Sequence, residues 1–236
     1  MRNLRKNMQI VFQDPYTSLH PRMSVGKNIE APLVINRQAL SRAERKKYVL
    51  ELMRRVGLND EQYNRYPHEF SGGQRQRVTI ARALALNPKL VICDEPVSAL
   101  DVSVRAQVLN LLKSLQKEMG LTYIFISHDL SVVEHVCDRI CIMYLGKIVE
   151  IGYKKQIFDN PFHPYTKALL SAAPDLENPD KKRIILEGDI PSPVNPPSGC
   201  RFRQRCAYAR PECSQTEPEM ITVETGHSVA CRLWEK

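Results

Sequence analysis

Asp94 and Glu95 are adjacent carboxylates that directly follow a short apolar run, residues 90–93. Such a run, bounded by turn signals, is typical of a strand buried on both faces of a parallel sheet. A nucleotide hydrolase needs one carboxylate to hold Mg²⁺, usually through water, and another to orient or deprotonate the attacking water. Because a buried strand would fix both groups rigidly, we interpret them as candidate hydrolytic residues. The alternative is that Asp94 and Glu95 simply cap the turn that follows the strand.

A glycine-rich turn at residues 71–77, Ser-Gly-Gly-Gln-Arg-Gln-Arg, is a candidate anion site. Gly72 and Gly73 let backbone N–H groups approach a phosphate closely, and Ser71 adds a hydroxyl donor. The helix expected from Gln74 onward would direct the positive end of its dipole to the same place. The simpler alternative is a Gly-Gly turn with a serine cap.

Two further polar residues lie where apolar strands are expected to end. Gln13 closes the run 8–13, and His128 follows the run 123–126. In parallel sheets with helical crossovers, chemistry is found at the carboxyl ends of the strands. A histidine there could hydrogen-bond a phosphate, although a lone histidine after a strand is more often structural. Gln13, taken alone, is most simply a polar loop residue.

The elements that must position these residues alternate between strands and helices. Ser41 and Glu44 form a capping box at the start of one helix, and residues 139–144 and 147–151 are typical of a hairpin. We expect strands at 8–13, 90–93 and 123–126, and helices at 24–36, 41–56, 74–86, 104–119 and 131–137. This alternation predicts an α/β fold with a parallel sheet.

The composition fits a soluble globular protein, with 43% hydrophobic and 25% charged residues in a chain of 236. No apolar run reaches 18 residues and the N-terminus is not a signal peptide, so we expect any membrane role to come through a partner. The net charge of +8 comes from Lys and Arg spread along the chain, which favours solvated basic faces.

The seven cysteines fall into two groups. Cys93, Cys137 and Cys141 lie in or beside apolar stretches, which predicts small buried side chains. The other four are Cys200, Cys206, Cys213 and Cys231. In a cytosolic protein such a cluster is more often a metal site than a disulfide framework.

Taken in order, the motifs resemble those of the ATPase subunit of ABC transporters over residues 1 to about 170. The matching segments are Gln-Asp-Pro at 13–15, the turn at 71–77, Asp-Glu-Pro at 94–96, Ser-Ala-Leu-Asp at 98–101 and Ser-His-Asp at 127–129. By this resemblance Gln13 is the Q-loop glutamine, which contacts Mg²⁺ and couples to the membrane subunits. Asp94 resembles the Walker B aspartate, Glu95 the catalytic glutamate, Asp101 the D-loop aspartate at the dimer interface and His128 the switch histidine.

The same resemblance makes Ser71, Gly72, Gly73 and Gln74 the signature motif. In the family this motif binds the γ-phosphate of an ATP molecule held by the opposite subunit, so two subunits enclose two ATP molecules. ATP would then tie the subunits together, and hydrolysis would drive a conformational switch.

The fold implied is an incomplete P-loop NTPase-type ABC ATPase domain at residues 1–158, with a parallel sheet core and a helical subdomain at about 20–88. Residues 159–236 would form a small Cys-rich extension. The family's Gly-x-x-x-x-Gly-Lys-Ser/Thr loop does not occur in the sequence, and Gly26-Lys27-Asn28 follows the Q-loop and lacks the hydroxyl. We therefore expect a fragment or a start codon assigned too late; a real truncated gene product is the less favoured third explanation. We also expect exposed apolar surface on the sheet and little ATP hydrolysis by these residues alone.

Residues 160–170, 190–193 and 196–200 resemble segments shared by the ATPase subunits of oligopeptide, dipeptide and nickel importers. The spacing C-x5-C-x6-C-x17-C resembles the motif that in some members holds a 4Fe–4S cluster. Structural Zn²⁺ is one alternative, and four cysteines without a metal are the other. The resemblance implies a second ABC ATPase subunit, two transmembrane permease subunits and, indirectly, an extracytoplasmic peptide-binding protein. It places the chain on the cytoplasmic face of the membrane, and it leaves the substrate open among oligopeptides, dipeptides and nickel.

Two other classes of protein compete with this interpretation. A non-transport ABC ATPase, acting on ribosomes or DNA, is disfavoured by the Pro- and Cys-rich tail and by the single set of motifs. A Cys₄ nucleic-acid-binding module is disfavoured because its arginines are few and only Phe202 and Tyr208 could stack on bases. We therefore expect no nucleic-acid partner.

Overall fold

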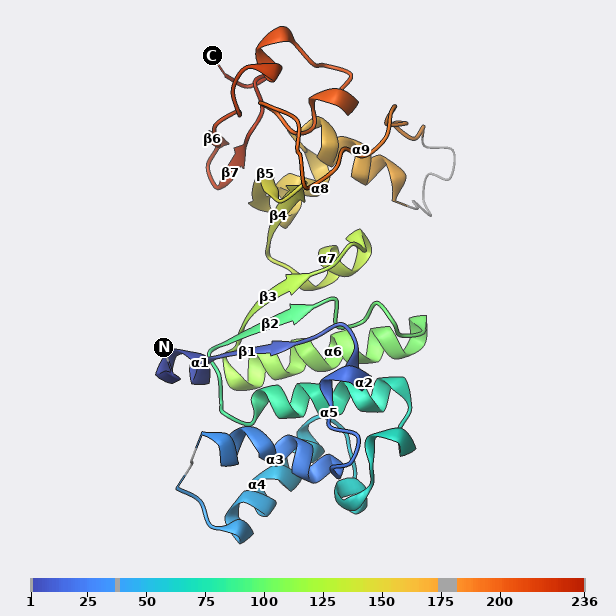
Figure 1. The fold of residues 1–236 in the computed structure, drawn as a ribbon, viewed down its shortest axis with the longest axis vertical. Coiled ribbons are helices and arrows are strands. Elements are labelled where there is room, and N and C mark those ends of the chain that lie inside the picture. Colours follow the sequence, from blue (N-terminus) through green and yellow to red (C-terminus); the bar gives the residue numbers. More distant parts are fainter. Residues whose placement is uncertain (1, 37–38, 174–181, 236) are drawn as a thin grey trace. The chain divides into compact units, whose positions relative to one another are not determined.

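The computed structural model describes residues 2–36, 39–173 and 182–235. The chain divides into two compact units, residues 1–128 and residues 129–236 (Figure 1). Within the described residues, no helix is long and apolar enough to cross a membrane.

The first unit is built on parallel strands β1 (Met8–Val11), β2 (Leu90–Asp94) and β3 (Thr122–Ile126), in the order β1-β2-β3. The strands are in register, with Ile10 beside Ile92 and Ile92 beside Ile124. All three were predicted, and the parallel sheet is confirmed. The helices α5 (Gly72–Leu84) and α6 (Val102–Met119) lie on one side of this sheet (Figure 1).

Apolar burial explains the position of α6. Its Val108, Leu112 and Leu115 are at most 1% exposed, and the hydroxyl of Tyr123 on β3 donates a 3.0 Å hydrogen bond to the carbonyl oxygen of Leu112. On the strands, Met8, Ile10, Ile124 and Ile126 keep 37% to 49% of their surface exposed.

Short helices make up the rest of this unit. They are α1 (Arg2–Asn7), α2 (Pro15–Ser18), α3 (Val25–Ile35) and α4 (Arg42–Arg55), followed by 3₁₀ turns at Asp60–Asn64 and Pro67–Glu69. The predicted capping box is confirmed, because Ser41 Oγ accepts from Glu44 N and Glu44 accepts from Ser41 N at 2.7 Å. The short helix α1 was not predicted.

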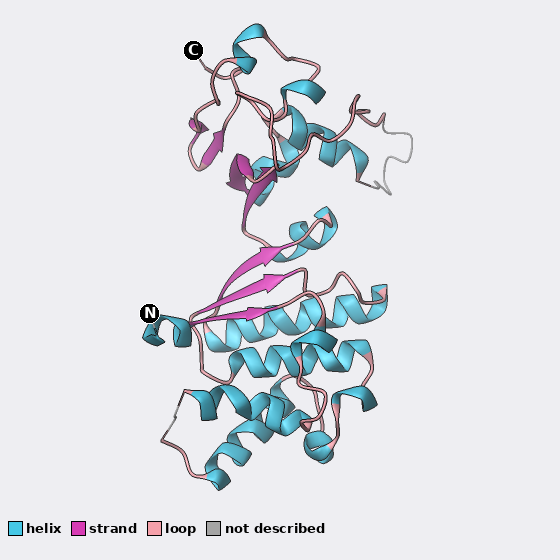
Figure 2. Cartoon of the chain, in the orientation of Figure 1, coloured by secondary structure: helices cyan, strands magenta, loops and turns pink. Residues whose placement is uncertain are grey.

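The second unit contains an antiparallel sheet, which the described residues form in the order β4-β5-β7-β6. Its elements are α7 (Leu130–Val136), β4 (Arg139–Tyr144), β5 (Lys147–Tyr153), α8 (Lys154–Asp159), α9 (Pro164–Ala172), β6 (Ile221–Glu224) and β7 (His227–Val229). The predicted hairpin is confirmed as β4 and β5. The pairing of β7 with β5 was not predicted, and loops connect most of the path after α9 (Figure 2).

Because β7 pairs with β5, the C-terminal segment and the hairpin belong to one compact unit. The units divide between His128 and Asp129, whereas resemblance to the family placed a boundary between residues 158 and 159. That boundary stays a prediction, and the Cys-rich segment lies within the second unit.

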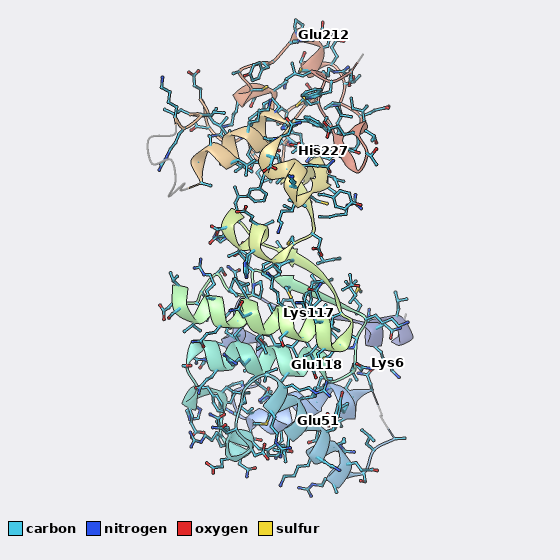
Figure 3. The ribbon with its side chains drawn as sticks, turned by 180° about the vertical axis from the view of Figure 1, so that it is seen from behind. Lys6, Glu51, Lys117, Glu118, Glu212 and His227 are labelled. Atoms are coloured by element: carbon cyan, nitrogen blue, oxygen red, sulfur yellow. The ribbon has the colours of Figure 1, made fainter. Side chains whose placement is uncertain are left out.

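A buried carboxylate, Glu150 of β5, organises the second unit. It accepts hydrogen bonds from the backbone N–H of Phe162 at 2.6 Å and of His163 at 3.0 Å. His227 of β7, which is labelled in Figure 3, donates a third bond from Nε2 at 2.8 Å. Both side chains of this pair are 0% exposed. Phe162 stacks on the ring of His227 with a centroid distance of 4.1 Å. One side chain thus connects β5, β7 and the segment before α9.

We predict that Glu150→Ala lowers the free energy of unfolding of the second unit by about 3–5 kcal/mol, because His227 and two backbone N–H groups lose their buried acceptor. The measurement is urea unfolding followed by fluorescence of Trp234, the single tryptophan of the chain, whose Nε1 donates to Phe162 O at 3.2 Å. Glu219→Ala, at an exposed loop position, is the control. Equal midpoints for the two variants would contradict the assigned role of Glu150.

Candidate functional site

Glu95 lies immediately after β2 in an unusual backbone conformation, with a φ of 45°. Positive φ is uncommon for a residue other than glycine and costs on the order of 1–3 kcal/mol. Glu95 N donates a hydrogen bond to Ile126 O at the end of β3, at 3.0 Å. Ser98 N and Oγ donate to Glu95 O at 3.2 and 3.0 Å. The backbone therefore directs the carboxylate of Glu95 to the edge formed by β2 and β3.

Gln13 and His128 contact the two oxygens of this carboxylate. Gln13 Nε2 donates to Glu95 Oε2 at 2.8 Å, and His128 Nδ1 lies 2.9 Å from Glu95 Oε1. The Glu95 side chain is 24% exposed and that of His128 is 73% exposed. Three residues that the sequence places at the ends of three strands thus meet at one point.

The hydrogen bond to Glu95 also limits what His128 can do. An ionised carboxylate only accepts, so Nδ1 of His128 carries the proton in this arrangement. In a neutral ring, Nε2 is then an acceptor. Donation from Nε2 to a phosphate requires either a doubly protonated ring or release of the bond to Glu95.

The glycine-rich turn begins helix α5, and the helix starts earlier than predicted. Ser71 is the N-cap: its Oγ accepts from Gln74 N at 3.3 Å, and its own N–H donates to Gln74 Oε1 at 3.0 Å. Gly72 and Gly73 are therefore in the first turn, not in a preceding loop. First-turn N–H groups lack partners within the helix, so this terminus keeps the donors that an anion needs.

Gly73 is required by the packing of α5 on α6. A Cβ atom at Gly73 would overlap Cγ1 of Val104, whereas one at Gly72 would lie 3.6 Å from Leu100 Cδ2, an ordinary contact. The two glycines thus differ in function: Gly73 permits the close approach of the helices, and Gly72 lies at their edge.

Two arginines of α5 contact the segment that follows Gln13, and the sequence interpretation missed both. The guanidinium of Arg75 lies 5.5 Å from the ring centroid of Tyr16, and Arg82 Nη1 donates to Ser18 O. Burial lowers the pKa of Arg82 from its ordinary value. The only signal in the sequence was that Arg75 falls inside the 71–77 motif.

The remaining candidates lie on the same unit. Asp94 is the last residue of β2 and is partly buried. Asp101 is the exposed N-cap residue of α6, and its side chain makes no capping hydrogen bond. Their roles toward Mg²⁺ and at a dimer interface stay predictions.

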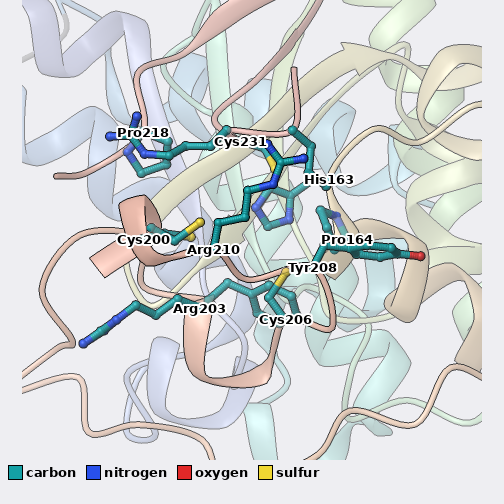
Figure 4. A pocket seen from close by; sticks show the side chains of 13 residues that line it. His163, Pro164, Cys200, Arg203, Cys206, Tyr208, Arg210, Pro218 and Cys231 are labelled. Atoms are coloured by element: carbon teal, nitrogen blue, oxygen red, sulfur yellow. The ribbon is translucent and has the colours of Figure 1, made fainter. Parts of the chain in front are cut away.

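The four C-terminal cysteines line one cavity of the second unit, together with His163, Phe202, Arg203, Arg210 and other residues (Figure 4). Cys200 N donates to Cys213 O at 2.8 Å. Burial, with a smaller contribution from the other three cysteines, raises the pKa of Cys231 to about 11. Burial also raises the pKa values of Cys200 and Cys206.

These thiols do not converge as a ligand set. In the part of the chain that the structure describes, no three His, Cys, Asp or Glu side chains are arranged to hold a metal ion. All seven cysteines are described, and no disulfide joins any of them. Cys93 is buried as predicted, but Cys141 is exposed, because alternate residues of β4 face outward. The prediction for Cys141 was wrong.

Comparison with known proteins agrees with this geometry. Residues 1–98 match the family model of the ABC transporter, and residues 149–213 match that of the oligopeptide/dipeptide transporter C-terminal region. The chain is 58% identical to the dipeptide transport ATP-binding protein DppF of Haemophilus influenzae, covering 96% of this chain and 69% of the relative. It is 56% identical to the oligopeptide transport ATP-binding protein OppF of Salmonella typhimurium, covering 98% and 70%.

Among solved structures, CbiO1 of Clostridium perfringens, part of the ABC transporter complex CbiONQ, superposes with a TM-score of 0.61 at 34% identity. The match covers 67% of this chain and 61% of that one. Fold and motifs together define an ABC transporter ATPase, a class that couples ATP hydrolysis to transport. Within that class, the chain belongs to the oligopeptide/dipeptide transporter family.

We predict that Gly73→Ala destabilises the first unit by about 1–3 kcal/mol, because the added methyl group overpacks the contact with Val104. Gly72→Ala is the matched control, with an ordinary contact and a better helix former. Urea unfolding followed by circular dichroism at the helical band measures both. A Gly73→Ala midpoint equal to or above that of Gly72→Ala would show that the helices are not held this closely.

Proposed function

We propose that this chain is the ATP-hydrolysing subunit that energises import of oligopeptides or dipeptides. The observation that carries the proposal is the meeting of Gln13, Glu95 and His128 at the carboxyl ends of adjacent parallel strands. The printed names of the relatives, which are dipeptide and oligopeptide transport ATP-binding proteins, support the substrate class.

In this proposal Glu95 orients and deprotonates the water that attacks the γ-phosphate. Each of its oxygens takes part in one hydrogen bond, with Gln13 or with His128, and keeps a second lone pair with which to accept a proton from that water. Asp94 and Gln13 supply the oxygen donors that Mg²⁺ prefers, and the ion when bound neutralises phosphate charge. His128, released from Glu95, donates to the γ-phosphate.

The signature residues Ser71, Gly72, Gly73 and Gln74 act on a different ATP molecule. Their first-turn donors bind the γ-phosphate held by the opposite subunit, and Asp101 lies at that interface. The Arg75 and Arg82 contacts connect this helix to the segment after Gln13. Movement of helix α5 is thus transmitted to the segment after Gln13, and movement of that segment to α5.

The partners that follow are a second ABC ATPase subunit, identical or homologous, two transmembrane permease subunits and, indirectly, an extracytoplasmic peptide-binding protein. The chain would then lie at the cytoplasmic face of the membrane through the permease subunits. We further propose that these 236 residues alone turn over ATP slowly, since their sequence contains no Gly-Lys-Ser/Thr loop.

Glu95→Gln, introduced at the chromosomal gene, is expected to reduce peptide uptake by about 10²–10⁴-fold, the usual contribution of a general base. Uptake of a labelled dipeptide and of a labelled pentapeptide is measured in whole cells. Glu134→Gln, at an exposed position of α7, is the control. Unchanged uptake of both peptides in the Glu95→Gln strain would refute the proposed function.

We also propose that Cys200, Cys206, Cys213 and Cys231 together hold a metal centre, an iron–sulfur cluster or alternatively zinc. The chemistry of the donor set fits either group, because four thiols border one cavity beside Arg203 and Arg210, whose charge offsets that of thiolates. The thiols do not converge as they stand. Binding therefore requires the turns to close. It also releases protons, because burial raises the pKa values of Cys200, Cys206 and Cys231.

For this centre, Cys231→Ser is expected to reduce bound metal to background in anaerobically purified protein. Iron, acid-labile sulfide and zinc are assayed in the same samples. Cys141→Ser, at the exposed position on β4, is the control and keeps the parent's content. Absence of both metals from the parent chain would remove the proposal.

A further inference from the structure

A second cavity of the C-terminal unit lies beside the cysteine cavity and takes no part in the functions proposed above. Its volume is about 310 Å³. The two cavities share a wall that includes Pro164, Cys206 and Tyr208, which Figure 4 labels. Pockets that enclose small organic molecules begin at about 300 Å³, so this cavity is large enough for a small organic ligand.

An apolar segment forms part of the lining of this cavity. Ile184 and Ile185 keep 49% and 86% of their surface exposed, although both line it. They precede Leu186, which packs against the hydrophobic core of the second unit. Ile184 N donates a 2.9 Å hydrogen bond to Ser171 Oγ of α9, which fixes the segment in place. Contiguous exposed apolar surface marks binding grooves, and here such surface borders a cavity.

Three charged residues line the same cavity: Lys167 of α9, Glu187 of the apolar segment and Arg205 of the 3₁₀ turn Arg203–Arg205. None of these side chains forms a salt bridge or a hydrogen bond with another described residue. Nε of Arg205 is buried and, among the described residues, lacks a hydrogen-bond partner. A buried donor without a partner is costly, so a ligand that supplies an acceptor to Arg205 gains the most.

These charges restrict the chemistry of the ligand. Arg205 and Lys167 are donors only, and a guanidinium group binds a carboxylate through two parallel hydrogen bonds. Glu187, when ionised, only accepts and therefore favours an ammonium group. A simple anion would leave Glu187 beside a like charge, and a simple cation would meet Arg205 and Lys167. A zwitterion with an apolar body satisfies all three side chains and also covers the isoleucines.

We propose that this cavity binds short peptides with apolar side chains. The C-terminal carboxylate binds Arg205 and Lys167, and the amino terminus binds Glu187. Two leucine side chains of the peptide Leu-Leu would cover Ile184 and Ile185, whereas a free amino acid has the same charges and one side chain only. The inference goes beyond the proposed ATPase function, because it places on this chain a binding site for the class of molecule that the transporter would carry.

The test is isothermal titration calorimetry of peptides into the full chain at neutral pH. For Leu-Leu, a ligand of modest size, we expect a Kd between about 10 μM and 1 mM. Leu-Leu amide lacks the carboxylate and is expected to bind at least about tenfold more weakly. N-acetyl-Leu-Leu lacks the ammonium group and is expected to lose about threefold, because Glu187 is exposed. Gly-Gly, which has both charges without the apolar side chains, is expected to bind more weakly than Leu-Leu.

Substitutions assign each end of the peptide to its partner. Arg205→Met keeps the apolar stem without the guanidinium, and it is expected to weaken Leu-Leu at least about tenfold. Glu187→Gln is expected to weaken Leu-Leu and to leave the affinity for N-acetyl-Leu-Leu unchanged, which a merely structural role of Glu187 would not do. Lys155→Met, at an exposed position of α8 outside the cavity lining, is the control and keeps the parent's affinity. Should Arg205→Met not fold, the comparison of the four peptides on the parent chain still decides.

Three outcomes would overturn the inference. The first is that Leu-Leu produces no heat of binding with the parent chain. The second is equal affinity for Leu-Leu and N-acetyl-Leu-Leu, which would indicate a site for apolar carboxylates such as fatty acids. The third is tighter binding of free leucine than of Leu-Leu.

Glu95→Gln separates this site from the proposed function. That variant is expected to lose peptide uptake but to bind Leu-Leu as the parent does, since Glu95 lies in the first unit and does not line the cavity. Peptide uptake without Leu-Leu binding would overturn the cavity assignment alone. Leu-Leu binding by a chain whose Glu95→Gln strain keeps normal uptake would overturn the proposed function alone.

Discussion

The in-register pairing of three parallel strands is the constraint on which the first unit depends. Strand ends that are aligned by backbone hydrogen bonds place the residues after them at one edge of the sheet. Gln13, Glu95 and His128 meet there although 82 residues separate the first pair and 33 the second. A shift of one strand by a single residue would move its polar group by about 3.3 Å, beyond hydrogen-bond reach.

The second unit depends on a different interaction, the buried carboxylate of Glu150. In the place of water, this carboxylate accepts hydrogen bonds from His227 and from two backbone N–H groups. The donors belong to two different segments of the chain. The same carboxylate holds His163 against the cysteine cavity. One side chain thus supports both the sheet and one wall of the cysteine cavity.

Local patterns predicted the elements of this fold well. The apolar runs before Gln13, Asp94 and Ser127 gave the strands, and the capping box at Ser41 gave the start of α4 within one residue. The order of the motifs identified the family. Each of these signals is carried by residues that are close together in the chain, which is why sequence alone could resolve them.

Contacts between distant segments were beyond that reasoning. The pairing of β7 with β5, the bonds of Glu95 to Gln13 and His128, and the place of His163 in the cysteine cavity all depend on how loops return the chain. The start of α5 at Gly72 was missed because glycine is a poor helix former, and the cap at Ser71 outweighs that preference. Cys141 was misjudged because the alternation of β4 matters more than the apolar character of its neighbours.

The return of β7 to β5 has a consequence for how the chain is made. Glu150 and His227 are 77 residues apart, which at usual rates of protein synthesis is a delay of roughly 4–15 s. Contacts of that range form only after a long loop has closed, so they are slow compared with helix formation. During this interval β5 is an edge strand with its outer side open and its carboxylate hydrated. An open edge invites pairing with other chains, so this strand is an aggregation hazard until β7 has been made and has covered it.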